Sequence, residues 1–107
     1  MAVIIVTQFR VNPGKTAAFG AMLQELTTVV QRHGARTRVL QSAFAGPNSL
    51  TISFLTENDD GASHGRYLDA VQADPAFQAW VAKLLDADPA ATIISNSVVQ
   101  DLPPYMG

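Results

Sequence analysis

The sequence contains no cysteine in its 107 residues. Disulfide bonds, thiolate metal sites and cysteine nucleophiles are therefore excluded. Charged residues are also scarce, at 15% of the chain, whereas an average soluble domain has about 25%. Because a small domain has much surface to cover with polar groups, this shortage indicates that part of the surface is buried against another molecule.

Basic clusters and long apolar runs are missing as well. The net charge is −2, and nucleic-acid binding is disfavoured because contacts to phosphates need concentrated Lys and Arg. No apolar run approaches ~18 residues, so no transmembrane helix is expected. The stretch from Met1 to Val6 has no basic region before it and no small-residue cleavage site, so we expect a cytoplasmic protein.

The sequence also lacks the motifs of metal and nucleotide sites. His33 and His64 are far apart and no spaced carboxylate motif accompanies them, so a three-ligand metal site is not expected. Gly14 lacks the companion glycines of a dinucleotide fingerprint, and no phosphate-binding glycine loop is present. We expect neither a metal nor another cofactor.

The patterns that are present follow a β-α-β-β-α-β order. Strand-like runs predict strands over residues 2–11, 36–45, 49–56 and 92–100. Helical spacing predicts a helix over 15–33 and a second helical block, which Asp74-Pro75 breaks in two by supplying an N-cap and a first helical proline. We expect a hairpin turn at 45–48 and a polar, acidic loop at 57–61.

This order predicts an α+β protein with a ferredoxin-like, four-stranded antiparallel sheet. The domain is expected over residues 1–102, with an extended tail over 103–107. The first strand is apolar on both faces, since Val3, Ile5 and Phe9 alternate with Ile4 and Val6. A sheet covered on one side only would alternate apolar with polar residues. The sheet is therefore expected to be covered by its own helices on one face and by a partner on the other.

Three short motifs point to a known group of proteins. They are Phe-Arg-Val-Asn-Pro-Gly-Lys at 9–15, Arg-His-Gly-Ala at 32–35 and Asp-Pro-Ala-Phe at 74–77. Together they resemble the dimeric α+β barrel superfamily, which includes antibiotic-biosynthesis monooxygenases and NIPSNAP-like proteins. The resemblance implies a homodimer in which two sheets pack face to face, with a pocket for a small molecule.

The resemblance leaves two classes of function open. One is cofactor-independent monooxygenation, or a related proton transfer, on an aromatic or apolar substrate. The other is a non-catalytic ligand-binding or assembly domain, because a fold alone does not set function. The heme-degrading members use an Asn, a Trp and a His at positions that correspond here to Thr7 or Gln8, Val71 and Val81, so heme degradation is not expected.

His64 is the candidate catalytic residue. An imidazole titrates near neutral pH, and His64 lies on an apolar helical stripe, so it can act as a general base beside an apolar pocket. The alternative is that His64 only caps the core. His33 ends a helix, where an interaction with the helix dipole is the simpler interpretation.

Six residues are candidates for binding the substrate. Tyr67 and Trp80 have the spacing of helix residues that pack on a sheet, and each either lines an aromatic pocket or belongs to the core. The other four candidates are polar residues on the expected strands: Gln8, Arg10, Ser53 and Asn96. If they share one face of the sheet, they can form a small-molecule site. Otherwise they are solvated, or they form hydrogen bonds across a dimer. Arg10 and Arg38 either bind a carboxylate or pair with the acidic loop.

Overall fold

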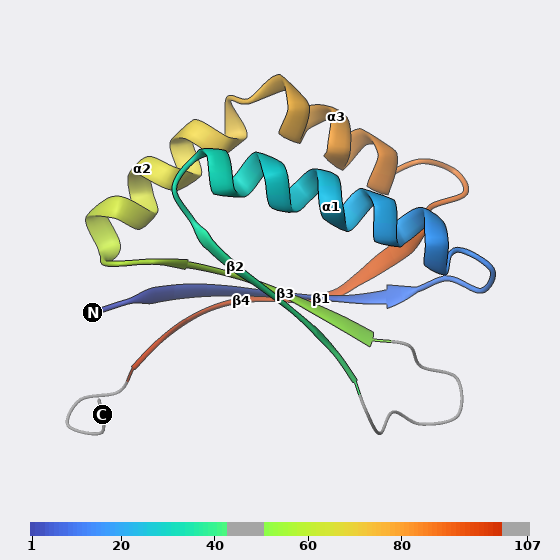
Figure 1. Cartoon of the computed structure of the whole chain (residues 1–107), viewed down its shortest axis with the longest axis horizontal. Helices are drawn as coiled ribbons and strands as arrows, with labels where there is room; N and C mark the ends of the chain where they lie inside the picture. The colour runs from blue at the N-terminus through green and yellow to red at the C-terminus, as the bar shows by residue number, and fades with distance from the viewer. Residues whose placement is uncertain (43–50, 102–107) are drawn as a thin grey trace.

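The computed structural model describes residues 1–42 and 51–101. The expected hairpin turn at 45–48 and the expected tail at 103–107 lie outside these residues. Within them the elements are β1 (Val3–Val11), α1 (Thr16–Arg32), β2 (Arg36–Gln41), β3 (Thr51–Asn58), α2 (Gly61–Gln72), α3 (Pro75–Leu84) and β4 (Ala91–Gln100). All three helices lie on one side of the sheet (Figure 1).

The four strands form one sheet in the order β2-β3-β1-β4, with every neighbouring pair antiparallel. This is the predicted α+β class with ferredoxin-like connections. The pairing of β1 with β4 is irregular between Gln8 and Phe9, where Ile94 has no partner and forms a β-bulge. The bulge shifts the alternation of β4 by one residue, which matters for the site described below.

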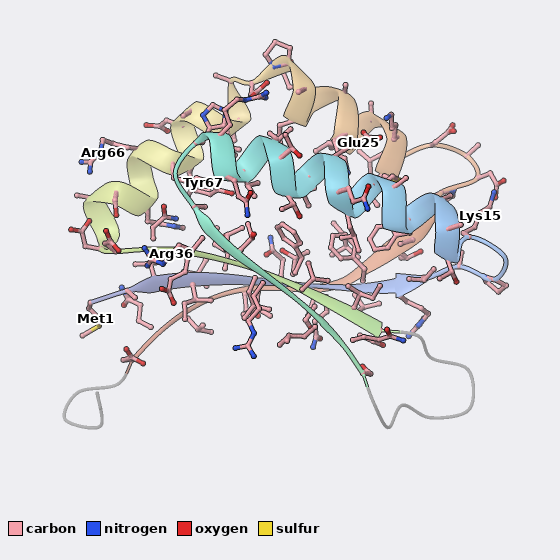
Figure 2. All side chains as sticks on the ribbon, in the orientation of Figure 1. Met1, Lys15, Glu25, Arg36, Arg66 and Tyr67 are labelled. Carbon is pink, nitrogen blue, oxygen red and sulfur yellow. The ribbon has the colours of Figure 1, made fainter. Side chains whose placement is uncertain are left out.

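The core lies between the helices and the sheet. Phe9 of β1 and Phe19 of α1 are almost fully buried, with ring centroids 5.0 Å apart, and the Trp80 ring meets Phe9 edge-on at 6.1 Å. The apolar stripe of α1 is buried as its helical spacing predicts. Figure 2 shows side chains filling this layer and other side chains projecting from the opposite face of the sheet.

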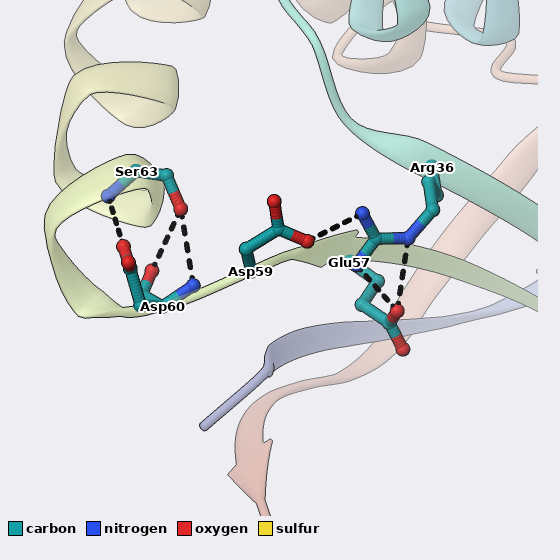
Figure 3. A network of polar contacts seen from close by, with 5 residues as sticks. All are labelled: Arg36, Glu57, Asp59, Asp60 and Ser63. Atoms are coloured by element: carbon teal, nitrogen blue, oxygen red, sulfur yellow. Dashed lines mark hydrogen bonds and ion pairs between the residues drawn. The ribbon is translucent and has the colours of Figure 1, made fainter.

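The predicted break in the second helical block is confirmed. Asp74 caps α3 by accepting a hydrogen bond at Oδ1 from the Ala76 backbone N–H at 2.8 Å, and Pro75 is the first helical residue. The start of α2 has a reciprocal capping box, in which Asp60 accepts from the Ser63 N–H at 2.8 Å and the Ser63 Oγ accepts from the Asp60 N–H at 3.1 Å (Figure 3).

Two sequence predictions about the acidic segment are wrong. β3 continues to Asn58, two residues past its expected end, because Glu57 pairs with Arg36 of β2 and Asn58 with Val3 of β1. The acidic side chains also bind Arg36, and not Arg10 or Arg38 as one of the two sequence interpretations had it. Arg36 holds Glu57 Oε2 at 2.6 Å and Asp59 Oδ1 at 2.7 Å (Figure 3).

The other face of the sheet carries no helix in the part of the chain that the structure describes. Its central residues are apolar and only half-buried, and Leu40 and Val99 on the flanking strands are 42% and 43% exposed. Ile4, Val6 and Leu55 form its centre, by the register of β1 and β3. We call this surface the open face. None of the helices described is long and apolar enough to cross a membrane.

Candidate functional site

A cavity of about 300 Å³ lies between the covered face of the sheet and the three helices. Its walls are mainly apolar, and aromatic rings contribute from both layers. They belong to Phe9 and Phe54 of the sheet, to Tyr67 of α2 and to Phe77 and Trp80 of α3. A cavity of this size with apolar walls is typical of sites for small organic molecules.

The mouth of the cavity lies beside β4. Residues that line the cavity there are well exposed: Leu85, just after α3, is 76% exposed and Ile93 of β4 is 46% exposed. Residues on the β1 and β3 side, such as Phe9 and Phe54, are buried. A ligand would therefore enter between α3 and β4 and come to rest against the centre of the sheet.

Five polar side chains at the cavity wall come from the sheet and α2, namely Thr7, Thr56, Tyr67, Gln72 and Asn96. Thr7 Oγ1 donates to Asn96 Oδ1 at 3.1 Å. Burial raises the pKa of the Tyr67 phenol, and the nearby Thr56 hydroxyl acts in the opposite direction. Thr56 Oγ1 nevertheless has no partner at hydrogen-bond geometry among the described residues, so the two hydroxyls are near each other without a formed bond.

The site is uncharged. Among the described residues, those that line the cavity include no Asp, Glu, Lys, Arg or His. A charged ligand would lose its hydration there without gaining an opposite charge, which is unfavourable by several kcal/mol. The arrangement therefore suits a neutral molecule. No group of three or more potential metal ligands occurs within residues 1–42 and 51–101.

The six candidate binding residues divide between the two faces of the sheet. Tyr67, Trp80 and Asn96 come together at the cavity. The other three, Gln8, Arg10 and Ser53, share the open face, where Gln8 lies opposite Ser53 and accepts a hydrogen bond from Ser95 Oγ at 2.8 Å. The condition that the four polar strand residues share one face is therefore not met, and their roles in binding remain predictions.

The β-bulge explains why Asn96 reaches the cavity. Ala91 and Ile93 face the helices, and strict alternation would next turn Ser95 toward them. Because Ile94 is the extra residue, Ser95 instead pairs with Gln8 on the open face and Asn96 pairs with Thr7 on the covered face. Sequence patterning cannot locate such an insertion.

His64 is placed near the cavity but not in its wall. It lies on α2 one turn before Tyr67, is half-buried, and its Nδ1 atom has no hydrogen-bond partner among the described residues. Its catalytic role remains a prediction. Trp80 is both a core residue and a pocket residue. It is 4% exposed and lines the cavity, and its Nε1 donates to the Met22 carbonyl at 2.7 Å.

Sequence reasoning missed Thr56 as a site residue. The signal was present in the alternation of β3, where Thr56 continues the face that carries Ile52 and Phe54. A threonine on an otherwise apolar face is a polar group that needs a partner inside the protein. The expected strand ended at Thr56, and this last residue was not assigned to the face that carries Ile52 and Phe54.

A polar cluster of Arg32, His33 and Asp74 joins the end of α1 to the start of α3. At the end of α1, Arg32 Nη2 and His33 Nε2 approach Asp74 Oδ2 at 2.6 Å and 2.7 Å. These two groups and the Ala76 N–H hold the pKa of the Asp74 carboxyl well below its usual value. His33 thus contacts a carboxylate directly, beyond the helix-end role expected for it.

Comparison with known proteins identifies the fold. No family model and no curated protein matches the sequence. Among solved structures, an uncharacterized NIPSNAP domain protein from Burkholderia xenovorans matches with a TM-score of 0.72 at 20% identity, over 100% of this chain and 98% of that chain. SnoaB, a cofactor-independent oxygenase from Streptomyces nogalater, matches with a TM-score of 0.67 at 15% identity, over 99% and 98%.

These identities are too low to carry function from one protein to another, but the match extends over nearly the whole of each chain. It agrees with the element order and sheet order described above. The chain therefore has the α+β fold shared by NIPSNAP-like proteins and SnoaB, as its sequence resemblance implied.

Proposed function

We propose that this protein is a homodimer whose covered cavity binds a small, neutral, largely apolar or aromatic molecule. The observation that carries the proposal is the cavity of about 300 Å³, with aromatic walls and a few polar groups from Thr7, Thr56, Tyr67, Gln72 and Asn96. Specific small-molecule sites have this composition, because apolar walls supply affinity and a few polar groups fix orientation.

The open face supports the dimer. Half-buried Ile4, Val6 and Leu55 lie at its centre, and exposed Leu40 and Val99 flank them. Water contact with these apolar residues is unfavourable, and a second copy presenting the same residues would remove it. The low charge content of the chain agrees with this arrangement.

For the chemistry at the cavity, we propose cofactor-independent oxygenation, which is the activity named for SnoaB. In such a reaction the substrate itself must supply the two electrons and two protons that reduce the second oxygen atom of O₂ to water. A neutral, electron-rich aromatic molecule meets this requirement and suits the uncharged cavity. The competing proposal is a domain that binds a ligand without transforming it.

Binding is tested with the only tryptophan of the chain, Trp80, which lines the cavity. Titration with 1,4-naphthoquinone should quench its fluorescence saturably, unlike the linear quenching of free N-acetyltryptophanamide. Val81→Phe adds bulk to the cavity wall and should weaken binding at least tenfold, whereas the matched change Val99→Phe on the open face should not. Linear quenching of the unmodified protein, or equal effects of the two variants, would contradict the proposed site.

Oxygenation is tested with anthrone. One oxygen atom of O₂ would replace the two hydrogens of its CH₂ group to give anthraquinone, and the other would leave as water. An oxygen electrode should record one O₂ consumed per anthraquinone formed, faster with the unmodified protein than with Val81→Phe. Saturable binding of the quinone without any protein-dependent O₂ uptake would favour the non-catalytic domain.

A further inference from the structure

Three buried polar atoms have no hydrogen-bond partner within the described part of the chain: Thr56 Oγ1, Asn58 Nδ2 and His64 Nδ1. Thr56 and Asn58 are only 4% and 5% exposed. Most buried polar atoms in proteins are hydrogen-bonded, and an unsatisfied one destabilises the fold. Three such atoms on two adjacent elements therefore mark a place where a ligand or a buried water can form hydrogen bonds.

The three atoms belong to one place in the fold. Thr56 and Asn58 are successive residues on the helix-covered face of β3, and His64 and Tyr67 are successive turns on one face of α2. Only Asp59 and Asp60 separate β3 from α2, so the first turns of the helix lie over the end of the strand. We call this group of Thr56, Asn58, His64 and Tyr67 the polar recess.

The polar recess meets the cavity at one side. Thr56 and Tyr67 line the cavity, whereas Asn58 and His64 do not. The other threonine in the wall, Thr7, already donates its hydroxyl hydrogen to Asn96. Thr56 and Tyr67 are the buried hydroxyls of the wall, and Thr56 Oγ1 is the one without a partner at hydrogen-bond geometry among the described residues.

We propose that the cavity side of the polar recess, formed by Thr56 and Tyr67, receives an uncharged hydroxyl or carbonyl oxygen of the cavity's ligand, and that Thr56 is the residue that selects for it. This inference rests on the proposed ligand site. A hydroxyl can both donate to and accept from the Thr56 hydroxyl, and the phenol of Tyr67 offers a second contact of the same kind. A carboxylate or phosphate is disfavoured, because no cation lines the cavity among the described residues.

The test compares two ligands that differ in one group. 2-Naphthol and 2-methylnaphthalene share a ring system, and the hydroxyl of one is replaced by a methyl group in the other. Their dissociation constants are measured by calorimetry for the unmodified protein and for Thr56→Val, which keeps the side-chain shape. We expect the preference for 2-naphthol to fall about tenfold in Thr56→Val, the size of one neutral hydrogen bond.

Two control variants and a stability measurement distinguish a role of Thr56 in ligand preference from a role in folding. Thr92→Val removes an exposed hydroxyl on the open face that does not line the cavity, so the preference should not change. Thr56→Ser keeps the hydroxyl and should keep the preference. The melting temperature of the empty Thr56→Val protein should be equal to or above that of the unmodified protein, since the change removes an unsatisfied buried group.

The outcomes distinguish this inference from the proposed function. If both ligands bind but Thr56→Val leaves their relative affinity unchanged, Thr56 does not select and only the inference is overturned. If Thr56→Val lowers the melting temperature markedly, its hydroxyl serves the fold and the inference is again overturned. If neither ligand binds the unmodified protein, the proposed ligand site fails as well.

Discussion

The two faces of the sheet are built from the same strands but treat polar residues differently. On the covered face, Thr56 and Asn58 are buried under α2, and each keeps a polar atom without a partner in the described structure. On the open face, the polar residues remain accessible or bonded to each other, as Gln8 and Ser95 are. Apolar residues lie on both faces.

This difference indicates a separate role for each face. Unsatisfied polar atoms in an apolar, covered layer are unfavourable unless a ligand bonds them. An apolar strip interrupted by solvated polar groups can remain in water until a second copy covers it. The covered face is accordingly interpreted as the ligand site and the open face as the dimer interface, and the following predictions test that division.

The largest effect is expected from Trp80→Ala on the covered face. Removing a buried aromatic side chain of this size should lower the free energy of unfolding by about 3–5 kcal/mol. Trp80 also donates a hydrogen bond to the Met22 carbonyl, which the alanine cannot replace. Urea denaturation followed by far-UV circular dichroism measures the change.

Trp80→Phe is the matched control, since it keeps an aromatic ring and loses the indole N–H. Its loss should be clearly smaller than that of the alanine variant. If Trp80→Ala costs less than ~1 kcal/mol while ligand binding disappears, Trp80 belongs to the ligand site alone and not to the core.

A charge on the open face should break the dimer and spare the fold. Val6→Glu would place an unpaired carboxylate at the centre of the proposed interface, because its neighbours on the adjacent strands are Leu55 and Ser97. Burying such a charge is unfavourable by about 3 kcal/mol or more, so the dimer dissociation constant should rise at least ~100-fold. Sedimentation velocity at several protein concentrations measures this shift.

Val39→Glu is the control for Val6→Glu. Val39 is an exposed β2 residue that pairs with Phe54, so it lies on the other side of the sheet from Val6. This variant should remain dimeric. A monomeric unmodified protein at micromolar concentration would refute the assigned role of the open face.

A pH-dependent effect on stability is expected from Asp74 and its contacts with His33 and Arg32. The pKa of the Asp74 carboxyl is lowered in the folded protein from an ordinary value of 3.8. The unfolded chain therefore binds the proton more readily, and the stabilisation from this carboxylate is present above about pH 4 and lost as the pH falls further. Asp74→Asn should show a smaller drop in melting temperature between pH 6 and pH 3 than the unmodified protein.

The opposite result, with an equal drop in both proteins, would mean that the Arg32 and His33 contacts do not contribute to folding. Asp69→Asn is the control, because Asp69 is an exposed acid on α2 that makes no ion pair among the described residues. Its melting temperature should follow that of the unmodified protein across the same range.

The smallest effect is expected from His64→Gln. Because His64 does not line the cavity, its replacement should change ligand affinity by less than about threefold, whereas Tyr67→Phe should change it more. A drop in turnover of ~10²–10⁴-fold, without loss of stability, would instead establish His64 as the general base that the sequence pattern suggested.

Much of the fold could be predicted from local signals. The stripe of α1 and the Asp74-Pro75 break were visible because spacing, capping and proline chemistry act within a few residues. The end of β3 was missed, since Glu57 and Asn58 look like loop residues until Arg36 and Val3 are known to lie beside them. Strand pairing of this kind depends on distant residues.

The site was harder to predict than the fold. A shift of one residue moves a strand side chain to the other face of the sheet, and the bulge at Ile94 makes such a shift in the middle of β4. It brings Asn96 to the cavity and leaves Ser95 with Gln8 on the open face. Composition and periodicity identify candidate polar residues but do not assign them to faces.

The most direct test of this division is to locate a bound ligand by nuclear Overhauser effects. With 2-naphthol in contact with the isotopically labelled protein, the account predicts cross-peaks from the ligand to the side chains of Phe54, Trp80 and Leu84, which line the cavity. Cross-peaks to Val6, Leu55 and Val99 instead would place the ligand on the open face and contradict the account.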